Sequence, residues 1–154
     1  MNNEFMLRAI KLSIESVKTG GGPFGSVIVR DNKIISEGFN KVTTTNDPTA
    51  HGEIVAIREA CKKLNNFNLS GSELYSSCEP CPMCLSAIYW GRIDKVYYAN
   101  TRKDAQEIDF DDSLIKSEFK KNIDKRKIPM IQIMRNEALK AFELWDKKSD
   151  KIKY

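Results

Sequence analysis

The sequence predicts an α/β protein in which helices cover both faces of a sheet. Segments whose apolar residues recur at helical intervals alternate along the chain with short apolar runs typical of strands. With 154 residues the chain is long enough for one hydrophobic core, and its 41% hydrophobic and 30% charged residues are typical of a globular protein. No internal repeat or low-complexity stretch interrupts it. We therefore expect a single domain over residues 1–154.

The first elements are a helix and a hairpin. A helix is expected over 3–18, where apolar side chains recur at mainly helical intervals, and the glycines at 20–22 end it. Strands are expected over 24–29 and 33–40, because Asp31-Asn32 between them is a turn signal typical of hairpins.

A second helix is expected to carry two candidate functional residues. Residues 41–47 are polar and predict a loop, and Asp47 before Pro48 resembles an N-cap followed by proline at the first helical position. The expected helix covers about 48–64. It would place His51 and Glu53 in its first turns.

The remaining elements continue the alternation. We expect a strand over 73–77, a helix that begins at Pro80 or Pro82 and ends near Gly91, and a strand over 94–99. The C-terminal part predicts, in order, a loop over 100–110, a helix over 111–121, an extended segment over 129–134 and an amphipathic helix over about 136–147.

Charge and hydropathy bear on whether the protein binds nucleic acid or spans a membrane. The net charge of +4 is uneven, because residues 114–154 hold 12 Lys and Arg against 6 Asp and Glu. Such a basic segment could meet nucleic acid, but its lysines alternate with acids and apolar residues, which favours a solvated helical face. No apolar run reaches 18 residues, so we expect no membrane span. The N-terminus lacks a basic segment followed by an apolar one, which indicates a cytoplasmic protein.

Two short motifs are the most informative feature, His51-Gly52-Glu53 and Pro80-Cys81-Pro82-Met83-Cys84. Cys81 and Cys84 are three residues apart and share a helical face, and His51 is the only histidine in the chain. Three such ligands hold zinc and keep its fourth position for a water molecule. Glu53, two residues from His51, is then placed to move protons. This pattern is typical of zinc-dependent nucleobase deaminases.

A structural zinc site is the competing interpretation. Cys78 could join His51, Cys81 and Cys84 and close the coordination sphere. That site would give Glu53 no role, and structural zinc usually stabilises smaller modules, so we favour the catalytic site. The fourth cysteine, Cys61, is expected to be a small buried apolar residue.

Longer runs of sequence support a family resemblance. The chain resembles the cytidine/deoxycytidylate deaminase superfamily in the runs Gly22-Pro23-Phe24-Gly25-Ser26-Val27-Ile28-Val29, Asn46-Asp47-Pro48-Thr49-Ala50-His51-Gly52-Glu53 and Cys78-Glu79-Pro80-Cys81-Pro82-Met83-Cys84. It is similar to the bacterial guanine-deaminating branch in Ala87-Ile88-Tyr89-Trp90, Phe110-Asp111-Asp112-Ser113 and the terminal Tyr154. The resemblance implies a three-layer α/β/α fold with a five-stranded mixed sheet. It also implies a homodimer whose subunits exchange the segment from about 110 to 154.

The resemblance also implies roles for individual residues. It assigns His51, Cys81 and Cys84 as zinc ligands and Glu53 and Asp112 as the carboxylates that handle protons and the departing amino group. It assigns substrate contacts to Asn40, which reads the purine edge, Phe24 and Trp90 at the base pocket, the Gly52 backbone N–H, and Tyr154, which closes the partner's site. The family usually has alanine where this chain has Gly52, a change that should cost about 1 kcal/mol of helix propensity.

The residues alone leave other interpretations open. Asn40 could be a turn residue after a strand, Asp112 a helix cap and Tyr154 part of a frayed terminus. Phe24 and Trp90 would more often be core residues than partners of a base.

The expected activity is hydrolysis of guanine to xanthine and ammonia, with zinc as cofactor. Three alternatives remain at this stage. The chain could deaminate adenosine in transfer RNA, or another small base or nucleoside such as guanosine or cytosine. It could also be a zinc-stabilised protein without turnover.

Overall fold

The structure is a computed structural model that describes residues 3–154. The chain divides into two compact units, 1–112 and 113–154. The first unit contains α1 (Asn3–Lys18), β1 (Gly25–Arg30), β2 (Lys33–Phe39), α2 (Val42–Thr45), α3 (Gly52–Leu64), β3 (Ser72–Cys78), α4 (Pro82–Trp90), β4 (Lys95–Asn100) and α5 (Arg102–Gln106). The second contains α6 (Ser113–Phe119), a 3-10 turn (Ile123–Lys125) and α7 (Arg135–Lys147).

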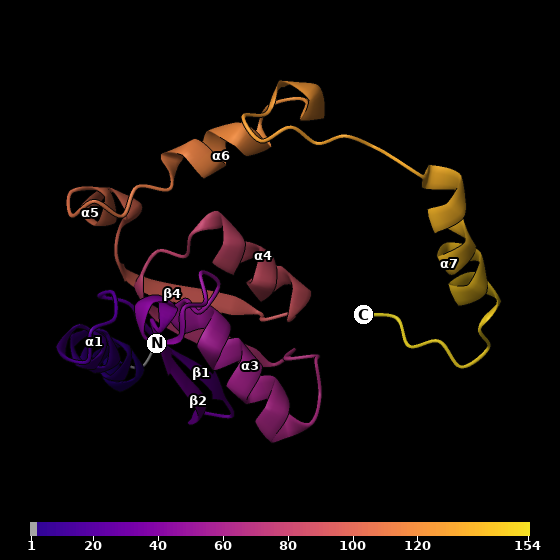
Figure 1. The fold of residues 1–154 in the computed structure, drawn as a ribbon. Coiled ribbons are helices and arrows are strands. Elements are labelled where there is room, and N and C mark those ends of the chain that lie inside the picture. Colours follow the sequence, from indigo (N-terminus) through magenta and orange to yellow (C-terminus); the bar gives the residue numbers. More distant parts are fainter. Residues whose placement is uncertain (1–2) are drawn as a thin grey trace. The chain divides into compact units, whose positions relative to one another are not determined.

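The first unit is a three-layer α/β/α sandwich (Figure 1). Its sheet has the order β2-β1-β3-β4, with antiparallel pairs β1–β2 and β1–β3 and a parallel pair β3–β4. Successive side chains of β1 point to opposite faces, so Val27 and Val29 pack with α1 while Ile28 packs with α3 and α4. The predicted α/β fold with helices on both faces is confirmed.

The sheet has four strands rather than the expected five. Residues 129–134, expected to be extended, form no strand and pair with no strand in the described part of the chain. A strand exists only when a neighbour completes its ladder of hydrogen bonds, and apolar alternation alone does not supply that neighbour.

The helix that carries the first motif begins at Gly52, not at Pro48. The Asp47 carboxylate accepts hydrogen bonds from the Thr49 backbone N–H at 2.8 Å and from its hydroxyl at 2.7 Å, which closes a local turn instead of capping the helix. His51, with an extended backbone at φ −68° and ψ 156°, is the N-cap residue. The ligand therefore lies immediately before the helix, and Glu53 lies in its first turn.

Two short helices replace expected loops. α2 lies within the polar segment 41–47, and α5 lies within 100–110. α5 begins with a capping box, in which the Thr101 side chain accepts from the Asp104 backbone N–H and the Asp104 carboxylate accepts from the Thr101 backbone N–H. This box places Arg102 at the first position of the helix.

The second unit has no core of its own. None of the described residues 113–154 is buried, although α6, α7 and the segment between them carry many large apolar side chains. The most exposed of these include Ile128, Ile131, Ile133, Phe142 and Leu144. Within the described residues, no helix is both long and apolar enough to cross a membrane.

Candidate active site

Two helix N-termini bring the predicted metal ligands together. His51 is the N-cap residue of α3 and Cys81 is the N-cap residue of α4, while Cys84 lies in the first turn of α4. The Nδ1 atom of His51 lies 3.6 Å from the Cys81 sulfur and 3.5 Å from the Cys84 sulfur. All three donor atoms lie within 4.8 Å of one another. The structure thus unites residues that are 30 and 33 positions apart.

The spacing of these donors fits a zinc ion. Zinc–sulfur and zinc–nitrogen bonds of about 2.3 Å and 2.05 Å, at a tetrahedral angle, separate the nitrogen and sulfur atoms by about 3.6 Å. The two observed distances, 3.6 and 3.5 Å, agree with that value. Two soft thiolates and one imidazole form a donor set that zinc prefers.

The protonation of the donors also suits a cation. The hydrogen bond between the two thiols lowers the pKa of Cys81 to about 4 and raises the pKa of Cys84, because the two sulfur atoms share one proton. The hydrogen bond that protonated His51 donates to the Cys81 thiolate raises the pKa of His51. A metal ion bound between these donors replaces such shared protons.

Glu53 is buried beside the ligands. Its side chain is 6% exposed, and Oε1 accepts a hydrogen bond from the Ser76 hydroxyl at 3.4 Å. Ser76 in turn accepts a hydrogen bond from the Ser26 hydroxyl at 3.2 Å, across the β1–β3 pair. Burial raises the pKa of Glu53, so the group is set to exchange protons closer to neutral pH.

Cys78 is not a fourth ligand in this arrangement. Among the described residues, the only group of donors close enough to hold a metal consists of His51, Cys81 and Cys84. The Cys78 sulfur instead donates to the Thr101 carbonyl oxygen at 3.5 Å. Burial raises the pKa of this thiol to about 11, which keeps it protonated. These facts favour an open metal site over one closed by a third sulfur.

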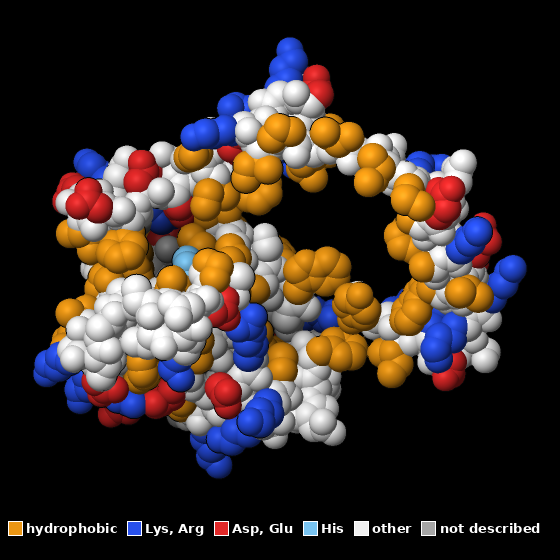
Figure 2. Space-filling view, viewed as in Figure 1, with side chains coloured by type: hydrophobic (Ala, Val, Ile, Leu, Met, Phe, Trp, Pro, Cys, Tyr) orange, Lys and Arg blue, Asp and Glu red, His pale blue; other side chains and the backbone are white. Residues whose placement is uncertain are grey.

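The ligands and Glu53 line a cavity of about 480 Å³. That volume lies in the range of small-molecule sites, about 300–1,000 Å³. Figure 2 shows the pale-blue histidine in a hollow bordered by hydrophobic side chains. Asn40 and Phe24, for which substrate contacts were expected, also line the cavity.

Asn40 is held in one orientation. Its Oδ1 atom accepts hydrogen bonds from the backbone N–H groups of Gly22 at 3.3 Å and Val42 at 3.2 Å. With Oδ1 engaged, the amide Nδ2 group is the part of this buried side chain that suits a ligand acceptor. The Asn40 side chain therefore stabilises a turn through its oxygen, as the alternative interpretation of the sequence held, and offers its amide N–H groups as donors at the cavity wall.

Two further contacts join residues that line the cavity. Phe110 meets Phe24 edge to face, with ring centroids 4.9 Å apart at 89°. Asp112 forms a two-point ion pair with Arg102, and both residues line the cavity. Cys78, which the sequence offered only as a ligand of a structural zinc, also lines the cavity. Phe110 and Arg102 line it as well, although no sequence pattern assigned either of them a role in the site. The apolar and charged pattern of 100–110 carried no such signal, because a loop was expected there.

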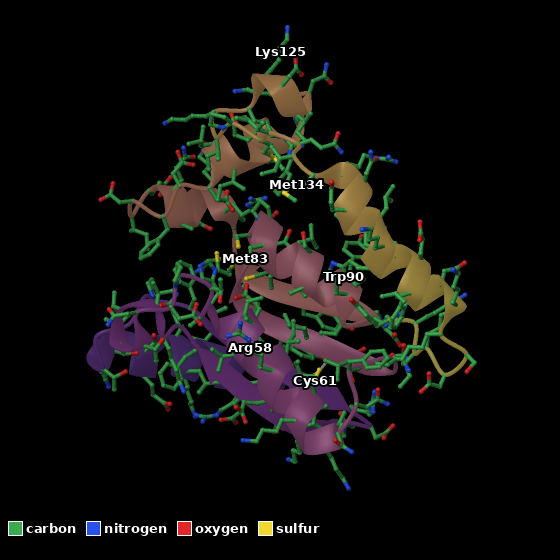
Figure 3. All side chains as sticks on the ribbon, turned by 45° about the vertical axis from the view of Figure 1, so that its right-hand side comes forward. Arg58, Cys61, Met83, Trp90, Lys125 and Met134 are labelled. Atoms are coloured by element: carbon green, nitrogen blue, oxygen red, sulfur yellow. The ribbon has the colours of Figure 1, made fainter. Side chains whose placement is uncertain are left out.

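Other predicted contacts are not assembled in the first unit. Trp90 is 65% exposed and lies at the opposite end of α4 from Met83, outside the cavity wall (Figure 3). Tyr154 belongs to the second unit and is 71% exposed.

Gly52 is buried at the first position of α3, where helical N–H groups have no intrahelical partner.

Comparison with known proteins agrees with this site. Residues 1–100 match the cytidine and deoxycytidylate deaminase zinc-binding region. The chain is 52% identical to the guanine deaminase of Bacillus subtilis over the full length of both, and its structure matches the X-ray structure of that protein with a TM-score of 0.96, covering 100% of this chain and 99% of the other. It is also similar to a guanine deaminase from Nitrosomonas europaea, with 30% identity, a TM-score of 0.66, and coverage of 70% of this chain and 63% of the other.

A tRNA-specific adenosine deaminase of Aquifex aeolicus is 42% identical over 100 residues, which are 64% of this chain and 66% of that protein. The match to the zinc-binding region covers the sheet and both ligand motifs. The chain therefore belongs to the cytidine and deoxycytidylate deaminase family.

Proposed function

We propose that this protein is a zinc-dependent enzyme that hydrolyses guanine to xanthine and ammonia. The observation that carries the proposal is the open group of His51, Cys81 and Cys84 beside buried Glu53, at a cavity sized for a small molecule. The full-length similarity to the Bacillus subtilis guanine deaminase supports guanine as the substrate.

The residues of the cavity suit a purine base. The edge-to-face pair of Phe24 and Phe110 offers an apolar wall for the flat ring system. The Asn40 amide can donate to the carbonyl oxygen of guanine, since its own oxygen is occupied. Asp112 can accept hydrogen bonds from N–H groups of the base.

Proton transfer is assigned to the carboxylates. A zinc ion at the three donors would supply a water-derived nucleophile near neutral pH, which free water with a pKa of about 15.7 does not. Glu53 takes a proton from the attacking water and delivers it to the ring nitrogen beside C2. The water oxygen bonds to C2, and its second proton passes through Glu53 or Asp112 to the exocyclic amine. The bond from C2 to that exocyclic nitrogen then breaks, ammonia leaves, and the C2 carbonyl of xanthine remains. Each such transfer typically contributes about 10²- to 10⁴-fold.

Transfer RNA is the weaker candidate substrate. The tRNA-specific relative from Aquifex aeolicus matches 64% of this chain, whereas the guanine deaminase from Bacillus subtilis matches all of it, including the second unit. A terminal segment that closes over a small base would obstruct a nucleotide held in a polymer.

A product assay tests the substrate. We expect purified protein containing about one zinc per chain to convert guanine to xanthine, and Glu53→Gln to lower kcat by at least about 100-fold with unchanged zinc content. Inosine formed in transfer RNA, with no xanthine from guanine, would instead support the editing function. Faster turnover of guanosine or cytosine would reassign the substrate and retain the metal chemistry.

We also infer a cytoplasmic homodimer that exchanges the segment from about 110 to 154. The second unit buries none of its large apolar side chains, and an isolated unit of this kind has little to stabilise it. Residues 129–134, which pair with no strand among the described residues, would supply the missing fifth strand along the edge strand β4. Exposed Tyr89 and Trp90 on α4 are a further apolar surface for a partner. In this arrangement Tyr154 closes the partner's cavity.

Complementation between inactive variants tests the exchange. Glu53→Gln and Tyr154→Ala subunits, each nearly inactive alone, are unfolded together and refolded. If the site takes its tyrosine from the partner, half of the dimers are mixed and each has one intact site, so activity returns to about a quarter of wild type. No recovery, or a monomer by light scattering, would contradict the exchange.

A further inference from the structure

Arg102 and Asp112 form a preorganised ion pair within the wall of the cavity. Arg102 Nε donates to Asp112 Oδ1 at 3.2 Å, and its terminal NH2 group donates to Oδ2 in a short contact. Both side chains are mostly shielded from solvent, with 20% and 23% of their surfaces exposed. A planar guanidinium that binds both carboxylate oxygens fixes the orientation of the carboxylate as well as its position.

Arg102 is itself linked by hydrogen bonds to the part of the chain that carries the metal ligands. The capping box of Thr101 and Asp104 defines the start of α5 at Arg102. The Arg102 backbone N–H donates to the Glu79 carboxylate at 3.4 Å, and the Glu79 backbone N–H donates to the Asn100 carbonyl oxygen at 2.8 Å. Through Arg102, the ion pair therefore connects Asp112 to the loop that leads to Cys81.

Asp112 needs such an anchor because of its place in the chain. It is the last residue of the first unit, and the following unit has no buried core of its own. Gln106 contacts the side chain of Asp111, and Phe110 contacts Phe24, but these bonds hold the neighbours of Asp112 and not its carboxylate. The carboxylate would otherwise sample several rotamers.

The geometry leaves Asp112 able to serve a ligand. A carboxylate has about four lone-pair sites, and the side-on guanidinium uses two of them. The remaining two can accept N–H groups of a bound base. Replacing the guanidinium by an apolar group would leave the charge without its partner and the acceptor without its orientation.

We propose that Arg102 is a positioning residue, which holds the Asp112 carboxylate as an oriented acceptor for the N–H groups of the base. The proposal rests on the proposed function of the site, since it assigns how Asp112 is presented to a purine. Arg102 acts through Asp112 and not through the metal ligands, so its removal should change turnover of the base without changing metal content.

A double-mutant cycle with chemical rescue tests the proposal. We expect Arg102→Ala and Asp112→Asn each to lower kcat/KM for guanine by about 30- to 100-fold, as displaced catalytic groups typically do. The double variant should be no more than about threefold below Asp112→Asn, since the two residues act as one unit. Millimolar guanidinium chloride should restore about tenfold in Arg102→Ala and nothing in the double variant.

Matched controls separate positioning from stability. Arg8 forms the same two-point pair with Glu37, at 2.8 and 2.6 Å, between α1 and β2 and away from the cavity. Arg8→Ala should keep kcat/KM within about twofold of wild type and should not respond to guanidinium. Zinc content, circular dichroism and oligomeric state are measured for every variant. If Arg102→Ala does not fold, Arg102→Lys carries the test, with a loss of about tenfold that is absent in the Asp112→Asn background.

The outcomes distinguish the inference from the function on which it rests. Wild-type protein that makes no xanthine but deaminates another base overturns the substrate, and the cycle is then run on that base. Active wild-type protein with Arg102 variants within about threefold of it overturns the positioning role and leaves the function intact. A loss that is additive with Asp112→Asn and insensitive to guanidinium also overturns it. Wild-type protein inactive on every base overturns both.

Discussion

At Gly38, which does not line the cavity, one added methyl group should displace residues of the active site. It lies in β2 directly beneath the start of α3. A Cβ atom at this position would lie 2.3 Å from the Gly52 carbonyl oxygen and 2.5 Å from the Ala56 backbone nitrogen. Both are backbone atoms, so no side-chain rotation relieves the overlap.

The size of the effect follows from these distances. Non-bonded carbon contacts are favourable at about 3.5–4.0 Å, so the strand and the helix must separate by about 1 Å. Overpacking of this kind costs about 1–3 kcal/mol. The moving end of α3 carries His51 and Glu53, and a misplacement of 1 Å can cost about 100-fold in rate. We expect Gly38→Ala to lower both the stability and kcat/KM by these amounts.

Gly71→Ala is the stability-matched control. Gly71 has φ +83°, and the nearest atom to an added Cβ is Arg30 Nε at 3.9 Å. The substitution should cost about 1–2 kcal/mol of backbone strain and leave kcat/KM unchanged. Urea unfolding gives the stabilities, and xanthine formation and zinc content report on the site. Gly38→Ala with wild-type turnover would refute the argument that close packing of β2 against α3 positions Glu53.

Three further predictions follow from the geometry. The pKa of Cys78 is raised to about 11 from an ordinary 9.0, so alkylation of this thiol at pH 8 should be about 100-fold slower than that of an unshifted cysteine. The alkylation rate should rise as the pH increases. Mass spectrometry measures the labelling, and rapid labelling at pH 8 would contradict the prediction. Gly52→Ala places a Cβ 3.2 Å from the Phe24 carbonyl oxygen, so strain and helix propensity should offset each other to within about 1 kcal/mol; a hundredfold loss of turnover would show a tighter constraint. Removal of metal by a chelator should abolish turnover and preserve the far-ultraviolet circular dichroism, because neither hydrophobic cluster contains a metal ligand; unfolding would favour a structural zinc.

Much of the first unit could be predicted because its signals are local. The expected helix over 3–18 agrees with α1, and the Asp31-Asn32 turn joins β1 to β2 with positive φ values of 50° and 57°. The end of α4 at Gly91 was also predicted correctly. Periodicity, turn residues and caps act over a few positions, so they can be recognised in sequence.

The start of α3 was predicted incorrectly, and the sheet has four strands where the resemblance implied five, because competing interactions decide both features. Asp47 closes a turn with Thr49 instead of capping a helix, and the outcome depends on the surrounding backbone. Residues 129–134 were expected to be extended, but an extended segment becomes a strand only where it has an edge to pair with. Neither condition is visible in the residue types.

The sequence by itself determined the donor set of His51, Cys81 and Cys84 with Glu53, because metal chemistry depends on which side chains are present and on short spacings. Only the tertiary structure decided three hydrogen-bonded contacts: Cys78 donates to the Thr101 carbonyl oxygen, the Asn40 amide oxygen accepts from backbone N–H groups, and Arg102 pairs with Asp112. These arrangements join residues from different elements. Their distances are set by how the helices pack on the sheet, and no local pattern encodes that packing.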